Sequence, residues 1–420
     1  ATTEIYTLSL HDALPISLGV VARPWNLPEF IWAAIGAVLL VAFDLLPWRE
    51  ALTAAGKGVD VYFFLIGMML LAEVARKEGL FDWLAVQAVR QSRRSASRLF
   101  AIVYAVGTVV TIFLSNDATA VVLTPAVYAA TRAAKVEPLP YLFVCAFIAN
   151  AASFVLPISN PANLVVFGER MPTLLEWLRY FALPSVIAIV ATFVLLRFSQ
   201  RESLQGDVES EEKGIALTRG AAIVAFGIGA TAVALLAASA LGRDIGLPTF
   251  VCGAIVTAIV LVLGRKSPLP VLRDVAWSVL PLVAGLFILV EGLNHTGVLP
   301  ALADVLKRAA ADAPKATAWG AGIVTAFASN LINNLPMGLI AATTSHAAQA
   351  SHEITGAILI GVDLGPNLSV TGSLATILWL IAIRREGEDV GATRFLKLGL
   401  LVMPPSLLLS LLSLSLVAPR

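Results

Sequence analysis

The chain has 420 residues, of which 58% are hydrophobic and 14% charged, and its mean hydropathy is +0.85. Soluble proteins carry about 25% charged residues, so this composition excludes an ordinary soluble domain and indicates a protein of the lipid bilayer. The net charge of +1 argues against nucleic acid as a partner. Both cysteines, Cys145 and Cys252, lie in apolar runs, which predicts buried core residues and neither a disulfide nor a metal cluster.

Several apolar runs are long enough to cross a membrane, at about 20 residues per span. They cover about 30–48, 58–76, 179–199, 219–242, 247–265, 274–292 and 394–417. Two more apolar stretches, 98–169 and 316–384, are interrupted by Asn, Asp, Ser, Gly and Pro. Such breaks persist at membrane depth only where protein or a water-filled cavity satisfies the freed backbone groups.

These interruptions predict an all-α, polytopic membrane protein with two kinds of broken segment. We expect re-entrant hairpins over 98–135 and 316–350, and discontinuous helices over 139–169 and 355–384. Short amphipathic stretches at 80–92 and 298–310 predict helices that lie at the membrane interface.

The domain organisation follows from one hydrophilic stretch, 200–218, which we interpret as a cytoplasmic linker. It separates repeat one, 1–199, from repeat two, 219–420. The first helix of repeat one is poorly defined, because 1–28 should match 219–242 but is polar and proline-containing. The same segment is also a poor signal peptide, so either the first span is weak or the start of the sequence is not the native one.

A duplicated pattern supports two repeats. The same spacing joins Gly67, Glu73 and Gly79 in the first half and Gly285, Glu291 and Gly297 in the second. Ser115-Asn116-Asp117 recurs as Ser329-Asn330 about 214 positions later, and the run 150–163 falls opposite 363–376. Duplicated polar groups within apolar sequence are typical of a two-repeat transporter that holds its substrate where the repeats meet.

Charge predicts the orientation of the chain. If the repeats are inverted, one face takes 20 of the 29 lysines and arginines: those near 90–98, 132–135, 197–219, 265–273 and 384–397, with Arg23, Arg76 and Lys77. Positive residues mark the cytoplasmic side, so this face and the linker are expected to be cytoplasmic.

Two acids stand at breaks in the apolar sequence, Asp117 at the first and Asp363 at the last. Ionisable groups at membrane depth are costly and usually mark ion or substrate pathways. Because burial disfavours a charged carboxylate, each acid is a candidate for reversible proton coupling. The alternative is that each carboxylate caps the N-terminus of a half-helix.

Amide and hydroxyl side chains accumulate at the same breaks, and they suit a neutral solute rich in hydroxyls because they both donate and accept hydrogen bonds. The candidate solute-binding residues are Asn116, Asn160, Asn163, Asn330, Asn333, Asn334, Asn367, Thr371 and Ser373. Some of them could instead satisfy the broken backbone.

Other polar residues favour structural roles. Glu73 and Glu291 lie near the ends of their spans, which favours a part in turning the chain over a part in proton relay. His295, His346 and His352 lack metal-ligand spacing, so we expect no metal site, and the sequence calls for no cofactor.

The motifs at the breaks resemble those of the arsenite efflux permeases, or arsenical pump membrane proteins, of the ion-transporter superfamily. The matching segments are Leu114-Ser115-Asn116-Asp117 through Leu123-Thr124-Pro125, Ala328-Ser329-Asn330 with Asn333-Asn334-Leu335-Pro336, Gly361-Val362-Asp363-Leu364-Gly365-Pro366, and Gly372-Ser373-Leu374-Ala375-Thr376 followed by Leu378-Trp379-Leu380. The resemblance runs from about residue 30 to the C-terminus and is most specific over 361–380.

This resemblance implies a multi-pass protein of the cytoplasmic (inner) membrane that exports arsenite and antimonite in exchange for protons. In that family a soluble ATPase subunit sometimes assists, and the sequence leaves both that partner and a homodimer open. Arsenite near neutral pH is largely As(OH)3, which amides and hydroxyls can bind. Thiolate ligation would require three nearby cysteines, and the chain has two.

Three other functions compete with this interpretation. A sodium/proton antiporter of the same superfamily would also use carboxylates and broken-helix carbonyls. A dicarboxylate carrier is disfavoured, because two acids at the site would repel a dianion. An intramembrane aspartyl protease would use Asp117 and Asp363 as its catalytic dyad, but it leaves the duplicated architecture without a role.

Overall fold

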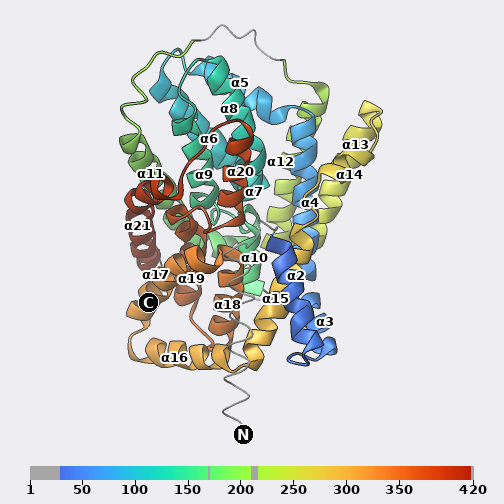
Figure 1. Ribbon diagram of the computed structural model, residues 1–420, viewed down its shortest axis with the longest axis vertical. Coiled ribbons are helices and arrows are strands. Elements are labelled where there is room, and N and C mark those ends of the chain that lie inside the picture. Colours follow the sequence, from blue (N-terminus) through green and yellow to red (C-terminus); the bar gives the residue numbers. More distant parts are fainter. Residues whose placement is uncertain (1–28, 169–170, 210–215, 418–420) are drawn as a thin grey trace.

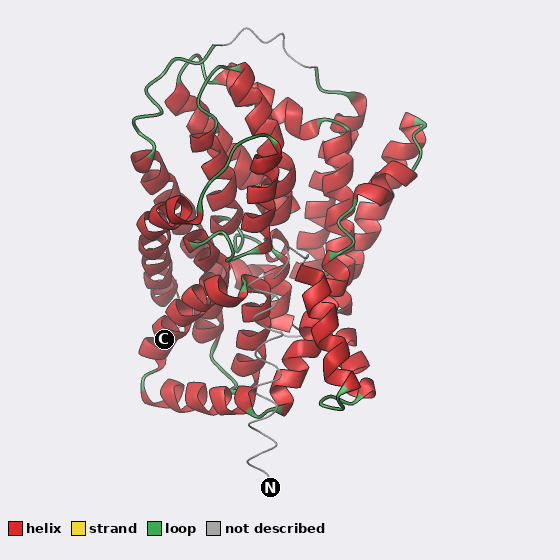
Figure 2. Ribbon diagram, in the orientation of Figure 1, coloured by secondary structure: helices red, strands yellow, loops and turns green. Residues whose placement is uncertain are grey.

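The computed structural model describes residues 29–168, 171–209 and 216–417, and over these residues the chain is helical with no strand (Figures 1 and 2). The weak first span expected within 1–28, and the middle of the linker, lie outside the described residues. Five helices are long and apolar enough to cross a membrane, and two bent pairs raise the number of candidate spans to seven within the described ranges.

The helices form two groups that pack mostly within themselves. The first group, which we call the frame, lies on the right of Figure 1. It contains α2 (Glu29–Ala42), α3 (Trp48–Gly56), α4 (Val59–Lys77), α12 (Arg219–Ala240), α13 (Gly246–Gly264), α14 (Leu269–Asp274) and α15 (Val279–His295).

The second group, which we call the body, contains every predicted break. Its first half holds α6 (Ala96–Leu114), α7 (Asn116–Ala118), a π-helical turn η2 (Thr119–Leu123), α8 (Thr124–Ala133), α9 (Leu139–Ala151), η3 (Pro157–Ser159), α10 (Pro161–Phe167) and α11 (Leu174–Ser199). Its second half holds α17 (Pro314–Ile332), α18 (Asn334–Ala347), α19 (His352–Leu364), η5 (Gly365–Leu368), α20 (Leu374–Arg385) and α21 (Ala392–Val417).

Two predicted spans are wrong at their boundaries. The expected span 30–48 is interrupted, because α2 ends at Ala42 and α3 begins at Trp48 after Pro47. The expected span 274–292 begins only at Val279, because α14 ends at Asp274 and a short connector follows. The other broken segments lie where the sequence predicts them, although α6 alone is long enough to cross a membrane.

The two halves repeat one order of elements. Leu139 and His352, which begin α9 and α19, are 213 positions apart, and the N-caps Asn160 and Ser373 keep the same separation. The predicted match between 150–163 and 363–376 is therefore confirmed.

The predicted match of Ser115-Asn116 with Ser329-Asn330 is wrong. The chain turns at Ser115 (φ 128°) and at Asn333 (φ 74°), which are 218 positions apart. This is the separation of Gly67 from Gly285, so one register holds from the frame to the hairpin tips. Ser329 lies within α17 and bonds the Thr325 carbonyl, a turn before the tip.

Equivalent elements of the two halves lie at opposite ends of the molecule. In Figure 1, α5 (Leu80–Gln91) lies at the top and α16 (Val298–Asp312) crosses the bottom, at 76° to α15. This placement is consistent with the predicted inversion. The ends of α5, α8, α13 and α20, which carry Arg90, Arg132, Arg265 and Arg385, lie toward the top, and we call this end the basic face.

The duplicated glycines have structural causes. A Cβ on Gly67 would lie 2.3 Å from the Thr249 carbonyl oxygen, so only glycine lets α4 approach α13 this closely. Gly79 and Gly297 have φ of 76° and 81° and stand immediately before α5 and α16. Each turns the chain from a frame helix into the helix expected at the interface.

Candidate functional site

The broken helices of the body restart at polar N-caps. Ser115 accepts a hydrogen bond from the Ala118 amide, Asn160 from Ala162, Asn333 from Leu335 and Ser373 from Thr376. Pro161 follows Asn160 at the first helical position, where its missing N–H costs nothing. Four half-helix N-termini, with their partial positive charges, are thereby fixed within the body.

Asp117 lies in the first turn of α7 and not at its cap, which is Ser115. Its charge therefore interacts with the dipole of the restarted helix, while Ser115 makes the capping hydrogen bond that the alternative interpretation assigns to Asp117. The side chain is half-buried, and within the described part of the chain no hydrogen bond to its carboxylate is found. An acid without a partner is free to interact with solute or solvent.

Asp363 is fully buried and lies one residue before the end of α19, so the capping alternative is wrong for this acid. A helix C-terminus disfavours negative charge. One oxygen, Oδ1, accepts a 2.8 Å hydrogen bond from Asn160 Nδ2. The other, Oδ2, is buried with no partner among the described residues.

The Asn160–Asp363 bond has an equivalent in the other half. At 213 positions' separation, Asn150 corresponds to Asp363 and Asn160 to Ser373. Ser373 Oγ donates to Asn150 Oδ1 at 3.2 Å, and Asn150 Nδ2 donates to Asn367 Oδ1 at 3.0 Å. Both polar atoms of the Asn150 amide therefore have a partner, whereas Oδ2 of Asp363 has none among the described residues.

Three of the predicted solute-binding amides instead hold the broken backbone. Asn163 Nδ2 donates to the carbonyls of Ser153, Leu156 and Pro157, at 2.9, 3.1 and 3.3 Å. Asn330 Nδ2 donates to those of Ala326 and Gly365, at 2.8 and 2.9 Å. Asn367 bonds the Phe147 carbonyl and Asn150. The structural alternative accounts for the hydrogen bonds that these three side chains donate, and Asn163 Oδ1 is buried with no partner among the described residues.

Other candidates retain free hydrogen-bonding groups. Asn334 is buried and its backbone amide donates to the Gly372 carbonyl, and no hydrogen bond to its side chain is found among the described residues. Asn116 and Asn333 use their side-chain oxygens locally, and within the described ranges no hydrogen bond is found for their amide nitrogens. Thr371 is exposed and bonds the Asn330 carbonyl, so it lies beside the second break.

An inner cavity lies where frame and body meet. It is lined from the frame by α4 and by residues 274–279, and from the body by Ser115, Asp117, Val121, Pro161 and Leu378. Water can occupy about 100 Å³ of it, which is room for several molecules. Its described lining includes the acids Glu73, Asp117 and Asp274 and no lysine or arginine.

The inner cavity continues into a wider vestibule of about 730 Å³. The two spaces share Glu73, Val121, Val122, Asp274 and Leu378, and the vestibule adds Arg385 and Glu386 at the end of α20. Arg385 and Glu386 stand at the end of α20 that lies at the basic face, so the vestibule extends toward that face.

Sequence reasoning does not single out two residues of the candidate site, Asn150 and Asp274. Asn150 was seen only as one end of a polar run, and its equivalence to Asp363 was the signal that could have identified it. No sequence signal identifies Asp274, because it lies outside the duplicated motifs. Over the residues that the structure covers, no group of three His, Cys, Asp or Glu side chains could hold a metal. Cys145 is buried as predicted, but the prediction is wrong for Cys252, which is partly exposed.

Helices long enough to cross a membrane, central breaks with polar caps, and a cavity between two helix groups are together the features of a membrane transporter. A protease dyad would place its two acids together at one water-filled site, whereas Asp117 lines the inner cavity and the fully buried Asp363 does not.

Comparison with known proteins gives the family. Residues 19–362 match the family described as citrate transporter, so the chain belongs to that family. One curated relative is an arsenical pump membrane protein of Escherichia coli, which is 26% identical over 92% of this chain and 93% of the relative. Another is a protein of Bacillus subtilis named putative arsenical pump membrane protein, which is 24% identical over 93% of this chain and 94% of the relative. An uncharacterized transporter of Mycobacterium tuberculosis is 25% identical, with coverage of 90% and 91%.

Two solved structures share the fold. The YdaH transporter of Alcanivorax borkumensis has a TM-score of 0.56 at 17% identity and covers 92% of this chain and 96% of its own. MtrF of Neisseria gonorrhoeae, from a class of antimetabolite efflux pumps, has a TM-score of 0.54 at 12% identity, with coverage of 98% and 94%.

Proposed function

We propose that this protein is a secondary transporter of the cytoplasmic membrane that exports arsenite or antimonite in exchange for protons. Its sequence relatives named arsenical pump membrane proteins support the substrate class. In the inner cavity Glu73 and Asp274 are paired with Arg76 and Lys77, so Asp117 is the one acid of its lining without an ion-pair partner among the described residues. An acid with no cation to balance it suits a neutral solute such as As(OH)3 and disfavours an anion such as citrate.

The observation that carries proton coupling is the exchange of an amide for an acid at equivalent positions. Both side-chain polar atoms of Asn150 are hydrogen-bonded, but Asp363 leaves Oδ2 without a partner in the core that the structure describes. A buried, unsatisfied oxygen is costly, and a group that gains and loses a proton is a reason for keeping it. We assign proton coupling to Asp363 and Asp117.

The solute-binding assignment narrows around the hairpin tips. Asn116, Asn333 and Asn334 have side-chain groups left to bind a solute, and Asn160 connects the cavity wall at Pro161 with Asp363. In this proposal Asn163, Asn330 and Asn367 keep the breaks in shape, and Thr371 and Ser373 support the second break.

The test is arsenite uptake into everted membrane vesicles driven by a proton gradient. Asp363→Asn should fold, because asparagine occupies the equivalent position 150, and its uptake should fall at least about tenfold. Asp304→Asn, which removes an exposed acid from α16, is the matched control and should transport normally. Unchanged uptake by Asp363→Asn would overturn the coupling assignment.

The same vesicles test the sodium/proton antiporter, which the cavity carboxylates also suit. A sodium gradient that drives proton movement in the absence of arsenite would favour that function. Assembly with a soluble ATPase subunit, and assembly as a homodimer, stay predictions.

A further inference from the structure

A short connector between α14 and α15, residues 275–278, forms one wall of the inner cavity. Val275, Ala276 and Val279 line it from this side, and Asp117 and Ala118 of the first hairpin line it from the body. The position of the connector therefore decides how wide the space beside Asp117 is.

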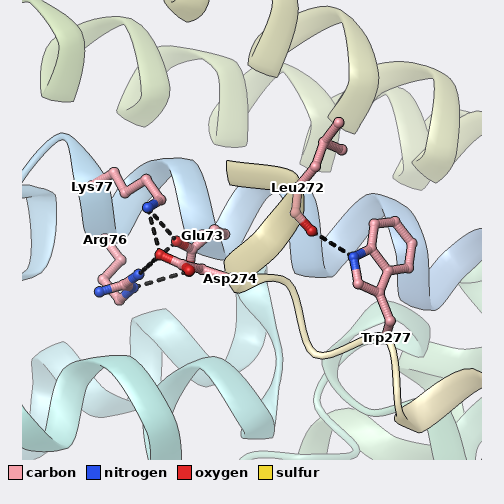
Figure 3. Close-up of polar contacts among 6 residues, drawn as sticks. All are labelled: Glu73, Arg76, Lys77, Leu272, Asp274 and Trp277. Atoms are coloured by element: carbon pink, nitrogen blue, oxygen red, sulfur yellow. Dashed lines mark hydrogen bonds and ion pairs between the residues drawn. The ribbon is translucent and has the colours of Figure 1, made fainter. Parts of the chain in front are cut away.

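Four charged side chains fix the start of this connector to the end of α4 (Figure 3). Asp274 lies 2.6 Å from Lys77 Nζ and 3.3 Å from an Arg76 Nη2. Glu73 receives two bonds from the same guanidinium, at 2.6 and 2.9 Å, and lies 3.4 Å from Lys77. Both acids share both cations, so their charges are balanced, which argues against Glu73 as a proton relay.

The other end of the connector is also held. The Trp277 indole donates a 2.5 Å hydrogen bond to the Leu272 carbonyl, one of the last carbonyls of α14 (Figure 3). That carbonyl has no later helical turn to bond. The connector is thus tied at both ends, once to α4 and once to the helix before it.

The charged cluster stands where the inner cavity meets the vestibule, because Glu73 and Asp274 line both spaces. The equivalent place in the other half differs. There Glu291 forms one 2.6 Å ion pair with Lys57, and neither residue lines the inner cavity or the vestibule.

We propose that the vestibule and inner cavity form an aqueous route from the basic face to Asp117, and that the cluster of Glu73, Arg76, Lys77 and Asp274 positions the connector so that this route stays open. The four residues are positioning residues, since they act through the connector wall. Asp363 is fully buried and lines neither space, so in this arrangement the route serves Asp117 alone. The inference rests on the proposed function for its meaning in transport.

The route can be tested by thiol labelling that needs no substrate. In a chain with Cys145→Ala and Cys252→Ser, Met69→Cys places a thiol in the inner cavity. Val190→Cys on α11 is the matched control, since it is exposed on an apolar helix face away from both spaces. Glu202→Cys reports which face is accessible in a given vesicle preparation.

A membrane-impermeant maleimide should label Met69→Cys in the same vesicles that allow labelling of Glu202→Cys, and should leave Val190→Cys unmodified. Adding Asp274→Asn should slow labelling at position 69 about fivefold or more, and Asp274→Glu should restore much of the rate. Labelling from the opposite face, or a rate that Asp274→Asn leaves unchanged, would overturn the proposal.

Transport separates the two proposals. If the parent protein fails to move arsenite but labelling follows the pattern above, the proposed function fails and the route stands. If arsenite moves but Met69→Cys is not labelled from the basic face, the route fails alone. Should Asp274→Asn fold poorly, the Asp274→Glu variant and the face dependence of labelling still decide the outcome.

Discussion

At the scale of single residues, the amides of the body divide by what their hydrogen bonds hold. Asn163 joins three backbone carbonyls that a broken helix leaves without partners. The Asn116 side chain accepts a hydrogen bond from the Asp117 amide through Oδ1, and within the described residues no partner is found for its amide nitrogen. A sequence shows both as asparagines at breaks, so it identifies the set and not the division within it.

This division predicts opposite effects of one substitution. Asn163→Ala should destabilise the protein by about 2–4 kcal/mol, because buried carbonyls lose their donor. Asn116→Ala should leave the melting temperature in detergent nearly unchanged and reduce arsenite uptake. Melting curves and vesicle uptake of both variants check the prediction, which fails if Asn163→Ala melts like the parent.

Asp274 allows a prediction about pH. Its hydrogen bond and ion pair with Lys77 hold the pKa of this carboxyl below its usual range. A lowered pKa means that the ion pair is complete above the ordinary carboxyl pKa of about 4 and is lost only as pH falls through the lower value. Labelling of Met69→Cys, corrected for thiol reactivity with Glu202→Cys, should therefore not change between pH 5.5 and 8. A decline over that range would show that another group controls the connector.

At the scale of elements, hydropathy and breaking residues predict most of the broken segments, because Asn, Pro and Gly act locally. The predicted register between the two hairpins is wrong for a physical reason. Sequence identity pairs Ser115-Asn116 with Ser329-Asn330. The structure pairs Ser115 with Asn333, because the chain turns with a positive φ at both, although the two residue types differ. Serine and asparagine both cap a helix with a side-chain oxygen, so the shared function is hidden in sequence.

Helix packing in the frame gives a further test. Gly67→Ala should destabilise strongly, because its Cβ would meet backbone atoms of α13 that cannot move aside easily. Gly229→Ala, in the middle of α12, meets no atom within 4 Å and is the matched control. In detergent, the melting temperature of Gly67→Ala should lie several degrees below that of the parent. The free energy of unfolding of Gly229→Ala should differ from that of the parent by no more than about 1 kcal/mol.

At the scale of the whole molecule, the division into frame and body was not predictable from the chain. It depends on which helices pack together, and apolar helices such as α13 carry no marked polar face to indicate a neighbour. The connector at 275–278 was not predicted either, because it lies inside an apolar run that the sequence presents as one continuous span.

Orientation is testable at this scale. Glu202→Cys, three residues after the end of α11, and Lys307→Cys, on α16, are both exposed and should be labelled from opposite sides of the membrane. The positive-inside rule places position 202 in the cytoplasm. Labelling of both thiols in intact cells would contradict the inverted arrangement.

The equivalence of Asn150 and Asp363 has a consequence for how the two halves diverged. Asn150 and Asp363 differ in one side-chain atom, a nitrogen in the amide and an oxygen in the acid. This difference makes position 363 ionisable and leaves position 150 neutral and hydrogen-bonded. A chain with asparagine at both positions would have a core that cannot change its charge there, and a chain with the two residues exchanged would carry the acid in its other half. The capacity of this buried layer to hold charge is therefore a property of one atom, which directed exchange can move from one repeat to the other.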